Sequence, residues 1–208
     1  MKPALFIDFD GTLSCDRLWQ SLGVDDYDRI NDFIFGNGGV LANDWMAGKY
    51  SSEQICREVA HGLGIAYSLL WDVLLEDCRN TRIDKQNLSK IDSLRRTFTL
   101  AMVTANMDCF DRFTMPALGL EKHFDYIINS CNEGVFKHDA NGNKSGLLEA
   151  AIRKTGAEVG RSILIDDSTR ACANFEKLGG RALRGDKTKP LSHWLDYLLN
   201  NKNNKICL

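Results

Sequence analysis

The sequence predicts an α/β fold in which a doubly wound parallel sheet carries a smaller helical domain. Two observations point to it. Short apolar runs alternate with longer segments of helical period, and such alternation favours a parallel sheet. One stretch, residues 14–84, interrupts the alternation without a strand pattern of comparable strength. We therefore expect a sheet domain made of residues 1–13 and 85–208 and a helical domain made of residues 14–84.

Local patterns place the individual elements. Five strands are expected at the apolar runs 4–9, 98–103, 126–129, 162–165 and 181–183. Within the helical domain, Ser51 and Gln54 have the spacing of a capping box, which predicts a helix from there to His61. A second helix is expected from Ser68 onward, and a further helix over residues 145–155 of the sheet domain.

Composition and charge describe an ordinary globular protein. The chain has 208 residues, a 44% hydrophobic content and a net charge of -2, which argue against a polybasic nucleic-acid binder. No run approaches the roughly 20 apolar residues of a membrane span, and no signal-peptide pattern precedes the first strand. The seven cysteines form no Cys-x-x-Cys pair. We therefore expect a reduced, cytoplasmic protein with neither a nucleic-acid nor a membrane partner.

Paired carboxylates follow the first expected strand. The segment 8–13 reads Asp-Phe-Asp-Gly-Thr-Leu, and residues two apart on a strand point the same way, so Asp8 and Asp10 are expected to converge on one hard cation. Gly11 would let the backbone turn sharply. Taken alone, the segment also fits a strand that ends in a solvated Asp-Gly turn.

Two further strands also end in polar groups. Asp166 and Asp167 follow the apolar run 163–165, and Thr104 ends the apolar run 99–103. The carboxyl ends of parallel strands are where open α/β sheets bind ligands. The repetition of acidic pairs therefore favours a binding or catalytic site over a solvated turn.

These motifs, in this order, resemble those of the haloacid dehalogenase superfamily of aspartate-nucleophile phosphohydrolases. The first motif is matched by residues 8–13, the second by Thr104 and the fourth by the pair Asp166-Asp167. The resemblance spans almost the whole chain. It implies a Rossmann-like core, with residues 14–84 as a helical cap that excludes water and supplies substrate contacts.

The resemblance also implies roles for these residues. Asp8 would be the nucleophile, ionised at neutral pH because an unperturbed aspartate titrates near about 3.9. Asp10 would be the general acid and base. Mg²⁺ would be held by Asp8, Asp10 through its backbone carbonyl, and the acidic pair Asp166 and Asp167. Phosphate would be bound by Thr104 and by the amides of Ala105 and Asn106, at the start of a helix.

The third motif of the family is a lysine, and two lysines are eligible. Lys144 opens the expected helix 145–155, so that only this helix and the strand at 162–165 lie between it and Asp167. That connection is the usual one in the family. Lys137 lies in a segment that resembles the family's Lys-Pro-Asp wording, with His138 in place of proline, and an Asn-Gly turn signal at 141–142 suggests a small hairpin there. We prefer Lys144 as the catalytic and phosphate-binding lysine and keep Lys137 as the alternative.

The expected function is a Mg²⁺-dependent phosphatase that acts on a small phosphorylated metabolite. Asp10 disfavours a dehalogenase, because cleavage of a carbon–halogen bond needs no acid at the leaving group. A phosphomutase on the same core, or a non-catalytic binding module, stays open. Arg17 follows the first motif closely and suits anionic oxygens, although a solvent-facing role fits equally well. The substrate and the oligomeric state are not predicted.

Overall fold

Five parallel strands form one sheet at the centre of the molecule. The computed structural model describes residues 2–138 and 146–201. The strand order is β3-β2-β1-β4-β5, and every neighbouring pair is parallel. The strands are β1 (Ala4–Ile7), β2 (Thr99–Thr104), β3 (Tyr126–Asn129), β4 (Ile163–Asp166) and β5 (Arg181–Arg184). The α/β class and all five strand positions are confirmed, with ends that differ by one or two residues.

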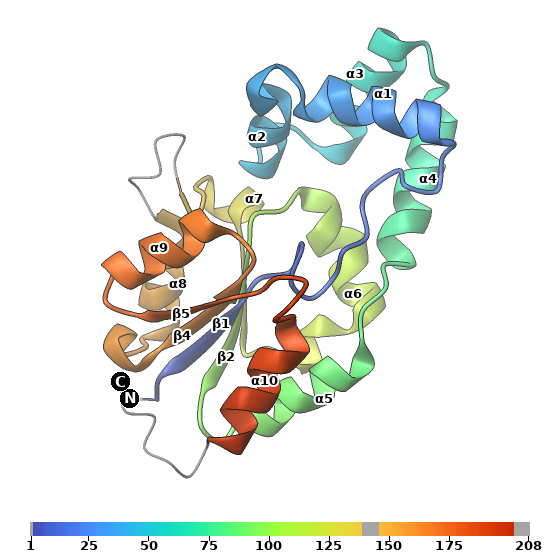
Figure 1. Cartoon of the computed structure of the whole chain (residues 1–208). Helices are drawn as coiled ribbons and strands as arrows, with labels where there is room; N and C mark the ends of the chain where they lie inside the picture. The colour runs from blue at the N-terminus through green and yellow to red at the C-terminus, as the bar shows by residue number, and fades with distance from the viewer. Residues whose placement is uncertain (1, 139–145, 202–208) are drawn as a thin grey trace.

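Helices cover both faces of the sheet, as in other doubly wound α/β folds (Figure 1). Leu5 and Ile7 of β1 pack on one face with α5 (Lys85–Leu94) and α10 (Leu191–Asn200). Ala4 and Phe6 face the other way, toward α8 (Gly146–Thr155) and α9 (Thr169–Lys177). Because side chains alternate along a strand, one short apolar run builds two hydrophobic layers.

Shorter elements complete the sheet part of the chain. They lie in the connections around β3 and before β4 and are η2, a π-helical turn (Phe110–Thr114), α6 (Met115–Leu118), η3 (Leu120–Lys122), α7 (Ser130–Glu133) and η4 (Val159–Arg161).

The segment between β1 and α5 is largely helical and packs around its own apolar cluster. Its elements are α1 (Val24–Phe35), η1 (Asn37–Gly39), α2 (Val40–Met46), α3 (Ser52–Leu63) and α4 (Tyr67–Arg79). Trp19 and Trp45 are the largest side chains of the cluster, 5.9 Å apart between ring centroids. Met107 and Cys109, which follow β2, belong to the same cluster, so the helices also pack on the sheet part.

The predicted capping box is present at the start of α3. The Ser51 hydroxyl accepts a hydrogen bond from the Gln54 amide at 3.3 Å, and the Gln54 side chain accepts one from the Ser51 amide at 2.8 Å. This reciprocal pairing satisfies two of the amides that a helix start leaves without partners. The α3 terminus is thus defined by the local sequence alone.

Asp108, just after β2, connects the helical segment to the sheet. It accepts hydrogen bonds from the Trp45 indole at 2.8 Å and from the Ser52 hydroxyl at 2.6 Å. Arg112 adds a two-pronged contact to Glu53, at 2.6 and 3.0 Å, and reaches Asp108 at 2.8 Å. These polar contacts fix α2 and α3 above the carboxyl end of β2.

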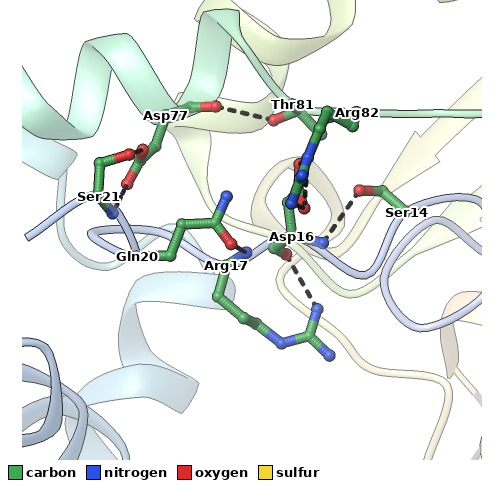
Figure 2. Close-up of polar contacts among 8 residues, drawn as sticks. All are labelled: Ser14, Asp16, Arg17, Gln20, Ser21, Asp77, Thr81 and Arg82. Carbon is green, nitrogen blue, oxygen red and sulfur yellow. Dashed lines mark hydrogen bonds and ion pairs between the residues drawn. The ribbon is translucent and has the colours of Figure 1, made fainter. Parts of the chain in front are cut away.

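A second set of polar contacts joins the two chain passages that connect the helices to the sheet (Figure 2). Asp16 of the first passage pairs with the Arg82 guanidinium of the second at 2.7 Å and accepts a bond from the Arg82 amide at 2.8 Å. Ser21 donates a short hydrogen bond to Asp77 nearby.

No helix within residues 2–138 and 146–201 is both long enough and apolar enough to span a bilayer.

The Glu53–Arg112 contact makes stability depend on pH. Hydrogen bonding to Arg112 lowers the pKa of Glu53 to about 2, from its ordinary 4.5. A carboxyl whose pKa is depressed by folding stabilises the folded state above its ordinary pKa, and the gain is lost as pH falls from 4.5 toward 2. We expect Glu53→Gln to lower the free energy of unfolding by about 0.5–1 kcal/mol at pH 7, a value typical of partly exposed pairs, and by much less near pH 2.5.

Chemical denaturation across this pH range measures the effect. Glu58→Gln, an exposed position on the same helix, serves as the control. An equal loss at both pH values would show that Glu53 acts through packing and not through its charge.

Candidate active site

Three neighbouring strands bring the predicted motifs to one edge of the sheet. β1 pairs with β2 on one side and β4 on the other, with Ile7 opposite both Met102 and Ile165. Asp8, Thr104 and Asp166 therefore stand at the carboxyl ends of adjacent strands, where parallel sheets bind ligands. All three are buried, with exposed fractions of 5%, 0% and 0%. Burial of polar groups at this density is costly unless they bind one another or a ligand.

Lys137 joins two of these carboxylates. Its ammonium lies 2.6 Å from Asp8 Oδ2 and 2.7 Å from Asp166 Oδ2, and only 6% of the residue is exposed. The Asn174 side chain donates to the Lys137 carbonyl at 3.2 Å and so holds its backbone. Lys137 was the alternative in the sequence-based assignment. The preferred Lys144, with the predicted turn at 141–142, lies outside the described residues.

Burial dominates the electrostatics of this cluster. It raises the pKa of Asp8 to about 8, although Lys137 lowers it and Asp166 raises it further. Burial lowers the pKa of Lys137, but the two carboxylates raise it by more, so the ammonium stays charged. Desolvation thus opposes the ordinary, ionised aspartate expected at position 8, and sequence gives no measure of desolvation. When both buried carboxylates are ionised, the single ammonium leaves excess negative charge, which a cation would offset.

The residues present fit a hard divalent cation. Carboxylate oxygens of Asp8, Asp166 and Asp167 lie within 4.8 Å of one another. Asp166 already binds Lys137 and accepts the Ser168 amide at 2.8 Å, whereas Asp167 is exposed. Desolvation and the neighbouring Asp166 raise the pKa of Asp167. An all-oxygen donor set without histidine or cysteine suits Mg²⁺.

Gly11 leaves room for this arrangement. Its φ of +76° lies in the left-handed region, and a Cβ atom there would stand 2.3 Å from Asp167 Oδ2. The turn also corrects one prediction. Because β1 ends at Ile7 and the chain turns at once, the two-residue period does not extend to Asp10, and the Asp10 side chain is absent from the carboxylate cluster. The predicted part of the Asp10 backbone carbonyl in holding Mg²⁺ stays a prediction.

Asp10 instead faces a different set of partners. Its Oδ2 accepts a hydrogen bond from the Asn106 side chain at 2.8 Å, and Arg17 Nη1 lies 4.0 Å from its Oδ1. Desolvation raises the pKa of Asp10 to about 6, while Arg17 and Lys137 oppose the rise. A carboxyl that titrates near 6 can both give and accept a proton at neutral pH.

Two of the groups predicted to bind phosphate, the Thr104 hydroxyl and the Asn106 amide, have different surroundings. Among the described residues, Thr104 Oγ1 is buried without a hydrogen-bond partner, so its hydroxyl is available to a ligand. The Asn106 amide, by contrast, donates to the Asn129 and Ser130 side chains, both at 3.1 Å. The following helix begins at Asp108, not at Ala105. The Asn106 amide is thus already paired in this structure, and its use in phosphate binding stays a prediction.

Sequence reasoning missed the role that Asn106 does play. Its side chain orients Asp10 from 96 positions away, and its amide is held by residues at the end of β3. No periodicity or motif in the sequence signals this pairing. Only the parallel register of β2 beside β1 brings the two residues together.

A cavity of about 430 Å³ opens beside Asp10. Asp10, Ala105 and Asn106 line it together with other side chains of the sheet part and with side chains of the helical segment, among them Arg17 and Phe35. Its volume is typical of sites that take small molecules. The cavity therefore provides space for a group attached to whatever binds at the carboxylate cluster.

Comparison with solved structures identifies this fold. A protein from Porphyromonas gingivalis described as a predicted HAD-like family hydrolase is 21% identical, with a TM-score of 0.75 over 99% of this chain and 100% of that one. A HAD family enzyme from Bacteroides thetaiotaomicron, in complex with magnesium and inorganic phosphate, is 14% identical, with a TM-score of 0.69 over 93% and 99% of the two chains.

A 2-haloacid dehalogenase from Pseudomonas syringae is also similar. It is 16% identical, with a TM-score of 0.65 over 96% of this chain and 99% of that one. No protein-family model matches the sequence, and neither does any curated protein. The chain thus has the fold of haloacid dehalogenase-like hydrolases, and its chemistry has to be argued from the site.

The carboxylate cluster predicts how the protein binds metal. Asp167→Asn should weaken Mg²⁺ binding about tenfold or more, because it removes the charge of the carboxylate that is least engaged with the protein. Calorimetric titration with Mg²⁺ measures the change. Asp44→Asn, which removes a surface carboxylate paired with Lys49, should leave the affinity unchanged. Equal affinities for all three proteins would place the cation elsewhere.

Proposed function

We propose that this protein is a Mg²⁺-dependent phosphohydrolase that cleaves a small phosphomonoester through an aspartyl-phosphate on Asp8. The observation that carries the proposal is the buried Lys137 bridge between Asp8 and Asp166, with Asp10 and the unpaired Thr104 hydroxyl beside it. Phosphoryl transfer needs little more than positioning and charge neutralisation, and these groups provide both. The bound magnesium and phosphate of the Bacteroides thetaiotaomicron structure are in keeping with it.

In the first step, an Asp8 carboxylate oxygen forms a bond to phosphorus while the bond from phosphorus to the leaving oxygen breaks. Asp10 gives its proton to that leaving oxygen. In the second step, Asp10 takes a proton from the water that attacks the phosphorus, which releases inorganic phosphate and restores Asp8. Asn106 holds the Asp10 carboxyl in place at 2.8 Å throughout.

Cationic and hydrogen-bonding groups stabilise the charge of the phosphoryl oxygens. Lys137 supplies a fixed ammonium, and the Thr104 hydroxyl can donate because no described residue uses it. Bound Mg²⁺, held by Asp8 and Asp167 with Asp166 nearby, would neutralise further oxygen charge and would favour the ionised form of Asp8.

Asp10 favours a phosphatase over a dehalogenase. A halide leaves without a proton, whereas an alkoxide leaving group needs one, and Asp10 lines the cavity with its pKa raised to about 6. The helical segment over the site would act as the cap that limits water and contacts the leaving group. A cytoplasmic location is in keeping with the free thiols of all six described cysteines.

Two substitutions separate the two aspartates. Asp8→Asn should abolish turnover, because the amide cannot attack phosphorus. Asp10→Asn should lower kcat by about 10²–10⁴ on an alkyl phosphate and by much less on 4-nitrophenyl phosphate, whose leaving group needs no proton. Initial rates of phosphate release with excess Mg²⁺ measure both, and Asp28→Asn on the exposed side of α1 is the control.

Other functions make different predictions in the same assay. Equal losses of Asp10→Asn on the two esters would remove Asp10 as the acid. Conversion of a sugar phosphate into its positional isomer, without release of inorganic phosphate, would indicate a phosphomutase. Absence of turnover on every ester by a protein that binds Mg²⁺ would indicate a binding module.

The two lysines are also distinguished by substitution. Lys137→Met should lower kcat/KM by about 10²–10³, because it removes a buried charge aimed at the phosphoryl oxygens. Lys144→Met should change it little. Circular dichroism comes first, since loss of one partner of a buried ion pair destabilises a protein by about 3–5 kcal/mol. A large loss confined to Lys144→Met would reverse the assignment.

A further inference from the structure

The cavity beside Asp10 is mostly apolar. Six of its lining side chains are large hydrophobic groups from both the helical segment and the sheet part, namely Phe9, Leu18, Phe35, Met46, Met107 and Phe110. An apolar wall of this size favours an apolar body in the leaving group, because burial of apolar area stabilises binding.

The few charged groups that line the cavity differ in how far their charges are neutralised by other residues. Asp10, Asp16 and Arg17 are its acidic and basic lining residues. Asp16 is neutralised by Arg82, which contacts both of its carboxylate oxygens. Asp10 is the proposed proton donor and faces Asn106. While Asp10 holds the proton that it donates, Arg17, at 4.0 Å from Asp10 Oδ1, is therefore the lining residue whose charge is least compensated.

Arg17 has donors to spare. Within the part of the chain that the structure describes, its guanidinium makes one hydrogen bond, from Nη1 to the Asp16 carbonyl at 3.0 Å. Figure 2 shows the guanidinium extending away from the other labelled side chains. Half of the side chain, 51%, is exposed, and Nη1 lies 4.0 Å from Asp10 Oδ1. The remaining N–H groups can form a two-pronged contact with an oxyanion.

The backbone that carries Arg17 is held from both sides. Its amide donates to the Gln20 side chain at 3.0 Å, and the adjacent Asp16 is tied to Arg82 of the second passage. Trp19, two residues on, is buried and donates its indole N–H to the Leu70 carbonyl at 2.8 Å. The guanidinium is thus presented from a fixed loop, which reduces the entropy that binding has to overcome.

From these contacts we infer that Arg17 determines specificity by binding a second oxyanion, a carboxylate or phosphate, on the leaving group of the substrate. The inference rests on the proposed phosphatase activity. It predicts a phosphomonoester in which an apolar body separates the ester from the second anion. The apolar body fills the cavity, Asp10 faces the ester oxygen and Arg17 faces the anion.

Four 4-substituted phenyl phosphates test the inference. Their side chains are three-carbon chains that end in carboxylate, phosphonate, methyl or ammonium, so the leaving phenols are of similar acidity, and the phosphonate stands for a phosphate without adding a second ester to hydrolyse. With Mg²⁺ present, kcat/KM should be about tenfold or more higher for the carboxylate or the phosphonate ester than for the methyl ester, and lowest for the ammonium ester. The better of the two anionic esters identifies the oxyanion.

Substitution of Arg17 should remove this preference. In Arg17→Gln, the ratio of kcat/KM between the anionic ester and the methyl ester should fall to about one, and Arg17→Lys should restore part of it. Arg57→Gln is the matched control, because Arg57 lies over the Tyr67 ring on the helical segment and does not line the cavity. A preference that survives Arg17→Gln, or wild-type protein that favours the methyl ester, would overturn the inference.

The failure of this inference is distinguishable from failure of the proposed function. Hydrolysis of all four esters at similar rates would leave the phosphatase and remove the role of Arg17. If no ester is hydrolysed, the phosphatase fails, and binding of the free phenols still tests Arg17. The affinities of the carboxylate phenol and the methyl phenol are then measured by titration, with chemical shifts of the protein as the signal. The wild type should bind the carboxylate phenol more tightly, and Arg17→Gln should bind the two alike. Equal affinities in the wild type would overturn the inference.

Discussion

The contact of Lys137 with Asp8 and Asp166 is the interaction on which the site depends. Three ionisable groups, each at most 6% exposed, meet within 2.7 Å at the edge of the sheet. Such a cluster is costly to desolvate, and loss of any one partner leaves an uncompensated buried charge. It is therefore a poor way to stabilise a fold and a good way to hold charge in a fixed geometry for a ligand.

The parallel arrangement of the strands brings these groups together. β1 lies between β2 and β4, so three chain segments with no local relation deliver their polar ends to one place. The bend at Phe9 then separates the two aspartates of the first motif. Asp8 remains with the lysine and the acidic pair, while Asp10 reaches Asn106 and the cavity. One short motif thereby supplies a carboxyl to the lysine cluster and another to the cavity.

The helical segment completes the cavity without contributing to the carboxylate cluster. It is fixed to the sheet by Asp108 and Arg112 at one side and by the Asp16–Arg82 pair at the connecting passages. Because the passages carry both Arg17 and its support, the position of the guanidinium is coupled to that of the helices. This coupling explains how a partly exposed arginine can have a defined place beside Asp10.

Local sequence determined much of the architecture. Strand positions follow from short apolar runs, the start of α3 follows from a capping box, and the acids at strand ends follow from reading where those runs stop. Each of these depends on residues within a few positions of one another, where periodicity and hydrogen-bonding chemistry are sufficient. The α/β class and the edge at which the site lies were predictable for that reason.

Only the tertiary structure decided which groups meet. It placed Lys137 between Asp8 and Asp166, gave the Asn106 amide to Asn129 and Ser130, and paired Asp16 with Arg82 across 66 positions. It also raised the pKa of Asp8 through burial. These outcomes depend on long-range packing and desolvation, which leave no periodic signal in the chain. The sequence determined the chemistry available at each strand end, and the fold decided which of those groups face one another.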